Sequence, residues 1–130
     1  MIGLDTSAII DLFRGNEELK KIIENNKEPF VITQISYLEL MFGIDNLNSK
    51  HEIECKFYDR LFDKLLVLDL NKASCRKASD IFFELKKKGK MIEQLDCTIA
   101  GILLSNGINK LITKNKKHFE NISGIKVIYY

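Results

Sequence analysis

The sequence predicts an α/β domain of three layers, with helices on both faces of a central, mainly parallel five-stranded sheet. Short apolar runs with the length of buried strands recur along the chain. Segments with helical spacing of apolar residues separate these runs, and strands that alternate with helices form parallel sheets covered on both faces. With 130 residues, 45% of them hydrophobic, and no repeat or linker, we expect a single domain over residues 1–130.

The expected elements follow each other in a regular order. The strands are expected at residues 1–4, 30–32, 66–68, 110–113 and 125–129. The helices are expected at residues 8–13, 16–23, 33–47, 53–65, 73–88 and 93–105. Gly15 and Gly89 end two of these helices, and Asn16 caps another. The helix at residues 93–105 is apolar on nearly all sides after Asp96, so we expect it to be buried.

Composition excludes several classes of protein. Charged residues make up 29% of the chain, and no apolar run approaches the length of a membrane-spanning helix. The start, Met1 to Asp5, lacks the basic region of a signal peptide. Cys55, Cys75 and Cys97 are odd in number and far apart, which favours reduced, buried thiols in a cytoplasmic protein over a metal or redox motif.

Two lysine clusters stand out against a net charge of only +2. One cluster comprises Lys86, Lys87, Lys88 and Lys90, and the other Lys110, Lys114, Lys116 and Lys117. Basic clusters bind nucleic acid in many proteins, but lysines also favour the last turn of a helix, where they complement its dipole. The helix-dipole explanation suits the cluster of Lys86 to Lys90 better. For the cluster around Asn115, both explanations stay open.

Four acid or amide side chains lie where elements begin or end. Asp5 follows the first strand, Asn115 follows the fourth, Glu39 lies in the helix after the second strand, and Asp96 opens the buried helix. Parallel α/β sheets bind ligands at the carboxyl ends of their strands, so these side chains are expected to line one pocket there. Clustered carboxylates repel each other unless a cation joins them, and oxygen ligands suit Mg²⁺ or Mn²⁺.

Each of these residues also has a simpler interpretation. Asp5 and Asp96 can cap helices, Glu39 can face solvent, and Asn115 can serve a turn. Glu93 is better explained as a first-turn helix acid than as a ligand, and His118 as a turn residue than as a base. The chain has no Gly-rich phosphate loop and no Gly-x-Ser-x-Gly nucleophile motif. Water activated by a metal is therefore the expected nucleophile.

At these positions the chain resembles PIN-domain ribonucleases of the VapC toxin type. The resemblance covers essentially all residues and depends on four segments taken in order. These are Leu4-Asp5-Thr6-Ser7, Ile35-Ser36-Tyr37-Leu38-Glu39-Leu40, Leu95-Asp96-Cys97-Thr98-Ile99-Ala100, and Thr113-Lys114-Asn115 with His118-Phe119.

The resemblance implies a metal-dependent endoribonuclease with Asp5, Glu39 and Asp96 as metal ligands and Asn115 beside them. Some members carry a fourth Asp where this chain has Asn115, so a tight second metal is in doubt. The substrate is expected to be RNA, with tRNA and rRNA as candidates. Substrate contacts are assigned to Thr6, Thr113, Lys114, Lys116 and Lys117.

The resemblance also implies two protein partners, an inhibitory antitoxin and a second copy of the chain. Tyr37, Met41, Phe42 and Phe57 are candidate dimer contacts, although a place in the core explains them equally well. Two alternatives to the nuclease remain at this point. One is a catalytically silent PIN-like module that binds RNA or protein, and the other is an unrelated α/β module that binds phosphate or signals.

Overall fold

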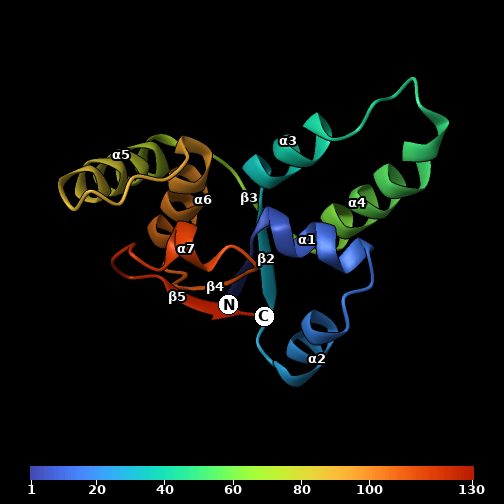
Figure 1. The fold of residues 1–130 in the computed structure, drawn as a ribbon, viewed down its shortest axis with the longest axis horizontal. Coiled ribbons are helices and arrows are strands. Elements are labelled where there is room, and N and C mark those ends of the chain that lie inside the picture. The colour runs from blue at the N-terminus through green and yellow to red at the C-terminus, as the bar shows by residue number, and fades with distance from the viewer.

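The computed structural model describes residues 1–130 and has the predicted layered architecture (Figure 1). The strands are β1 (Ile2–Leu4), β2 (Phe30–Thr33), β3 (Leu66–Leu68), β4 (Lys110–Thr113) and β5 (Lys126–Tyr129). The helices are α1 (Thr6–Phe13), α2 (Glu17–Asn25), α3 (Gln34–Phe42), the short 3₁₀ turn η1 (Ser49–His51), α4 (Glu52–Lys64), α5 (Lys72–Lys87), α6 (Gln94–Ser105) and α7 (Lys116–Phe119).

The sheet is parallel throughout, with the strand order β3-β2-β1-β4-β5. Gly3 pairs with Leu111 and Leu4 with Ile112, so β1 and β4 are neighbours in the sheet. The chain leaves β1 towards β2 on one side, whereas β4 lies on its other side. The strand order therefore reverses between β1 and β4, which is where open α/β sheets bind ligands.

The two faces of the sheet carry separate apolar clusters. Val31 and Leu111 belong to a cluster of 13 buried residues with α5 and α6. Their strand neighbours Ile32 and Ile112 belong to a cluster of 9 with α1, α2 and α4. This follows from the two-residue period of a strand, which sends successive side chains to opposite faces. Figure 1 shows α5, α6 and α7 on one side of the sheet, with α1, α2 and α4 on the other.

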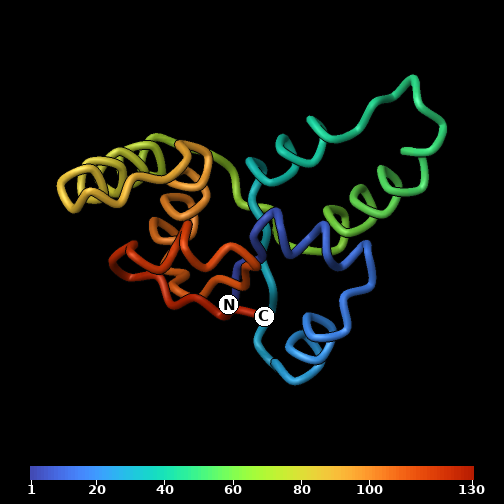
Figure 2. The backbone as a smooth tube through the Cα atoms, in the orientation of Figure 1, coloured from blue at the N-terminus to red at the C-terminus, as the bar shows by residue number.

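Helix α3 is shorter than the sequence suggested. It ends at Phe42, where the backbone N–H groups of Gly43 and Ile44 donate to the carbonyls of Leu40 and Met41. Leu47, which was expected on the apolar face of this helix, lies in the following loop and is 97% exposed. Figure 2 shows this loop and its flanking helices as an arm that extends away from the sheet.

Two further expectations need correction. A helix, α7, occupies residues where only a turn was expected. The thiols are all free, but only Cys97 is buried, and Cys75 is exposed.

Of the four candidate dimer contacts, Phe42 alone is largely exposed. Met41 and Phe57 pack against the core cluster on the α1 face of the sheet. Tyr37 packs edge-on against Phe62 and is therefore also partly covered. No helix combines the length and apolar character needed to cross a membrane.

Candidate active site

The four side chains singled out in the sequence line one pocket of about 420 Å³ at the carboxyl edge of the sheet. The lining residues are Asp5, Thr6, Ser7, Ile10, Glu39, Glu93, Leu95, Asp96, Asn115 and His118. No lysine or arginine lines this pocket, so its charge is strongly negative. Thr6 is the one expected substrate contact among the lining residues.

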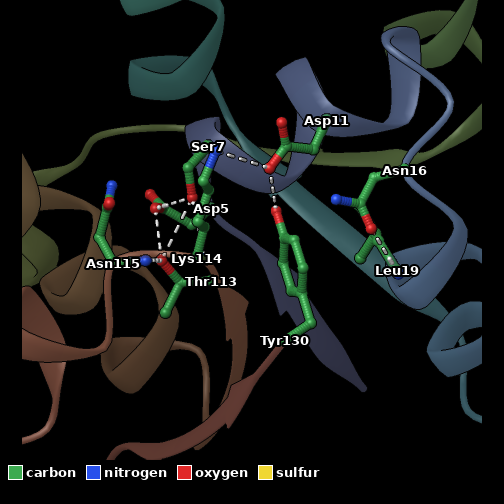
Figure 3. A network of polar contacts seen from close by, with 9 residues as sticks. All are labelled: Asp5, Ser7, Asp11, Asn16, Leu19, Thr113, Lys114, Asn115 and Tyr130. Carbon is green, nitrogen blue, oxygen red and sulfur yellow. Dashed lines mark hydrogen bonds and ion pairs between the residues drawn. The ribbon is translucent and has the colours of Figure 1, made fainter.

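Asp5 owes its position to the end of β1. Its backbone N–H donates to Ile112 of β4, and its side chain is almost fully buried. Although Asp5 precedes α1, its carboxylate caps no helix N–H, so the capping interpretation is wrong. Instead Oδ2 accepts hydrogen bonds from Ser7 Oγ at 2.9 Å and Thr113 Oγ1 at 2.8 Å (Figure 3). One oxygen is thus held by the protein, which fixes the orientation of the carboxylate.

Thr113 joins β4 to this arrangement. It is fully buried, its hydroxyl lies between Asp5 and Ser7, and it accepts the backbone N–H of Asn115 at 2.9 Å. A buried hydroxyl does not meet substrate, so the expected substrate contact at Thr113 is wrong. Its contacts show that it orients Asp5 and the start of the loop after β4.

Glu39 points at α1 rather than at solvent. Its Oε1 accepts a hydrogen bond of 2.7 Å from Thr6 Oγ1, and Thr6 also contacts Ser36 at 3.1 Å. Burial raises the pKa of Glu39, and the nearby charges of Asp96 and Asp5 raise it further, against the lowering effect of the Thr6 hydrogen bond. The ionised form of Glu39 is therefore disfavoured in the folded protein without a cation.

Asp96 lies in the first turn of α6, but the capping position is occupied by Glu93. Burial raises the pKa of Asp96, as does the charge of Asp5, while His118 opposes the shift. His118 Nδ1 lies 2.8 Å from Asp96 Oδ2, a contact between residues 22 positions apart. His118 was interpreted as a turn residue, and this pairing is the main site feature that sequence reasoning missed.

Asn115 is exposed at the start of α7, and its side chain makes no capping hydrogen bond. It lines the pocket without closing it. No three His, Cys, Asp or Glu side chains in the structure are arranged closely enough to hold a metal ion by themselves. The pocket gathers the acids but leaves space between them.

Residues 2–125 match the PIN domain family. The chain belongs to the PIN-domain family. Its architecture and the order of its acidic residues thereby agree with the resemblance seen in the sequence.

Among its relatives, this PIN domain is 37% identical over 100 residues to ribonuclease VapC3 of Methanocaldococcus jannaschii, which covers 76% of the chain and 94% of that protein. It is 27% identical over 125 residues to the tRNA(fMet)-specific endonuclease VapC of Salmonella typhimurium. This match covers 95% of the chain and 93% of that protein. A crystal structure of DNA-bound VapBC from Salmonella typhimurium superimposes with a TM-score of 0.83 at 26% identity. The superposition covers 99% of this chain and 98% of the chain in that structure. A chain in the structure of VapBC2 of Rickettsia felis, bound to a promoter DNA fragment, has the same fold, with a TM-score of 0.83 at 23% identity. The superposition covers 100% of this chain and 99% of that chain.

The lysines around the PIN-domain pocket differ in their surroundings. Lys110 pairs with Glu28 and sits at the opposite end of β4 from Asn115. Lys114 Nζ lies 3.7 Å from the buried carboxylate of Asp11. Lys116 and Lys117 are exposed on α7. Of the first cluster, Lys86 and Lys87 occupy the last turn of α5, as the helix-dipole explanation predicts.

Asp11, Tyr130 and Lys114 form a second set of polar contacts that the sequence did not reveal. Tyr130 Oη donates to Asp11 Oδ2 at 2.7 Å, and the same oxygen faces Lys114 (Figure 3). The backbone N–H of Lys114 donates to Ser7 Oγ at 3.2 Å. The end of β4 is therefore attached to α1 at two places, one beside Asp5 and one at Asp11.

We expect Tyr130→Phe to destabilise the protein by about 1 to 2 kcal/mol, because it leaves a buried carboxylate with one hydrogen bond fewer. Urea denaturation measures the change. Tyr129→Phe is the matched control, since Tyr129 is 59% exposed. Equal stability of the two variants would show that the Asp11 contact is dispensable.

We also expect Glu39→Gln to stabilise the metal-free protein slightly near pH 7, because solvent screening keeps the effect of a half-buried charge small. The folded-state pKa of Glu39 is raised above its ordinary value of 4.5, so the parent loses stability as pH rises through that window. Glutamine carries no charge and can still accept the Thr6 hydrogen bond. Thermal melts in EDTA should show a gain at pH 7 that disappears near pH 4, and a loss at pH 7 would contradict this.

Proposed function

We propose that this chain is the toxin of a VapBC-type toxin–antitoxin pair and acts as a metal-dependent endoribonuclease. The observation that carries the proposal is a pocket with Asp5, Glu39 and Asp96 at the strand-order reversal of a PIN domain. The ribonuclease and endonuclease names of its VapC relatives support the RNA substrate. The tRNA-specific relative makes tRNA the first RNA to test.

The donor set suits Mg²⁺ or Mn²⁺. All three acids offer hard oxygen ligands, and Asp5 and Asp96 each have one oxygen engaged by the protein and a second one not engaged in a hydrogen bond. Mg²⁺ usually keeps several waters and takes only one or two carboxylates directly, which is compatible with acids that do not converge. Asp5 and Asp96 would hold the ion, with Glu39 direct or through water.

Within the proposed reaction the ion supplies charge neutralisation and a more acidic water. The protein's part is to fix the acids. Ser7 and Thr113 orient Asp5, Thr6 orients Glu39, and His118 orients Asp96. Each carboxylate is thus held at one oxygen, which leaves the other free to meet water or a phosphate oxygen in a defined direction.

We also propose two protein partners, an inhibitory antitoxin and a second copy of the chain. A small antitoxin would silence the pocket by inserting a basic side chain, since an arginine can pair with two carboxylates. The VapBC complexes among the structural relatives support such a partner. We further propose that the chain acts in the cytoplasm and forms homodimers, with Phe42 as the candidate contact that is most exposed.

The test is incubation of the purified chain with a tRNA pool, with EDTA or with Mn²⁺. We expect discrete RNA fragments only with the metal. RNA binding without cleavage in any metal would instead favour the catalytically silent alternative.

Substrate binding provides an independent prediction. We expect Lys116→Ala and Lys117→Ala each to lower the slope of log affinity against log salt by about 0.7, because each removes one contact with a single-stranded phosphate backbone. Lys110→Ala is the control, since Glu28 already neutralises Lys110. Fluorescence anisotropy at several salt concentrations measures the slopes, and an unchanged slope in the Lys116/Lys117 double variant would refute an RNA track over α7.

A further inference from the structure

A second depression adjoins the acidic pocket and is unlike it in character. It has a volume of about 680 Å³, within the range of small-molecule sites. Glu93 and His118 line both hollows, so they form the wall between them. The other lining residues are Phe82, Met91, Ile92, Gln94 and Lys117.

One side of this depression is apolar and firmly supported. Phe82 of α5 and Ile92 of the α5–α6 connection pack against the larger core cluster. Met91 lies beside them and is 57% exposed, in a connection otherwise rich in charged residues. A Met thioether makes favourable contacts with aromatic rings. This wall can therefore take a flat ring against it.

The rest of the lining is polar and includes one lysine. Lys117 and His118 come from α7, and Gln94 opens α6. The backbone carbonyl of Gln94 accepts from Thr98, whereas its side-chain amide is free to offer both a donor and an acceptor. An apolar wall, an amide and a cation together match a heteroaromatic ring with a hydrogen-bonding edge and a nearby phosphate.

We propose that this depression binds the unstacked base of the nucleotide next to the scissile phosphate. The inference rests on the proposed ribonuclease function, since the acidic pocket must hold that phosphate. Single-stranded RNA is recognised by splaying bases out onto apolar and aromatic side chains and reading their edges. Phe82 and Met91 would contact the face of the base, Gln94 its edge, and Lys117 the neighbouring phosphate.

Abasic RNA tests this directly. A short fluorescent RNA that the parent cuts at one position is resynthesised with a single abasic nucleotide at each position near the cut. We expect one abasic position beside the cut to lower kcat/KM about tenfold with the parent protein. Met91→Ala should lower cleavage of intact RNA and show little further loss at that abasic position. Ile53→Ala is the control, because Ile53 is a 75% exposed apolar residue on α4.

Two results would overturn the base site. The first is an abasic profile that is the same for Met91→Ala and the parent. The second is that no abasic position near the cut lowers cleavage by the parent while Met91→Ala weakens binding of the copurified antitoxin, which would make the depression a protein contact.

If the parent cuts no RNA at all, the proposed function fails, and a short fluorescent single-stranded RNA with one abasic nucleotide at each position in turn then tests binding by anisotropy in EDTA. A single abasic position that weakens binding by the parent but not by Met91→Ala supports the base site. Equal weakening in both proteins rejects it.

Discussion

Asp5→Asn is expected to lower RNA cleavage about a thousandfold at saturating Mn²⁺ while leaving the protein folded. The change removes one of the charges that would hold the ion, and a metal supplies several kcal/mol of charge stabilisation to the transition state. Asparagine has nearly the same volume as aspartate. Its carbonyl oxygen can still accept from Ser7 or Thr113, so the end of β1 keeps its contacts.

Single-turnover cleavage with parent and variant measures this loss. Asp69→Asn is the matched control, because Asp69 is an exposed carboxylate in the connection after β3. A circular dichroism melt shows whether the variant is folded. A folded Asp5→Asn protein that cuts as fast as the parent would remove Asp5 from the proposed metal site.

Gly101→Ala is expected to destabilise the fold by about 2 kcal/mol or more, the largest effect on stability that we foresee. A Cβ at Gly101 would lie 2.7 Å from the backbone N of Ala78 and 2.8 Å from the carbonyl oxygen of Ser74. Backbone atoms cannot move aside as a flexible side chain can, so α5 and α6 would have to separate. Overpacking of this kind costs about 1 to 3 kcal/mol or more and exceeds the gain in helix propensity from alanine.

Urea denaturation of Gly101→Ala and Gly43→Ala forms the comparison. Gly43 ends α3 with negative φ, and a Cβ there would meet Leu40 only at 3.4 Å, so its replacement should be nearly neutral. Because α6 also carries Asp96, the Gly101 variant should lose cleavage at temperatures where the parent is active. Equal stability of the two variants would show that the α5–α6 contact has room to spare.

Much of the fold was predictable because its signals are local. The buried strands around Val31 and Leu111 are short aliphatic runs, and Asn16, Gly15 and Gly89 mark helix ends where the structure has them. The acids could be grouped because parallel strands bring their carboxyl ends to one edge. Side-chain contacts are not needed to place the acids there.

What the sequence did not reveal depends on pairs that are distant along the chain. Asp96 and His118 are separated by 22 residues, and Asp11 and Tyr130 by 119. No periodicity links such partners. The role of Thr113 was misassigned for the same reason, since only the structure shows that its hydroxyl is buried against Asp5.

The end of α3 was also missed. An apolar residue such as Leu47 fits a helical pattern, although the loop hydrogen bonds around Asp45 keep it outside the helix.

Anomalous scattering from crystals soaked in Mn²⁺ would locate the proposed ion without reference to activity. We expect one strong peak in the pocket, within coordinating distance of the carboxylates of Asp5 and Asp96, that is lost in Asp5→Asn crystals. Glu39 should lie beside it, in direct contact or through one water. A pocket without a peak at saturating Mn²⁺ would rule out the metal site at Asp5 and Asp96. So would a peak confined to other acids, such as Asp45 and Glu52 on the α3–α4 arm.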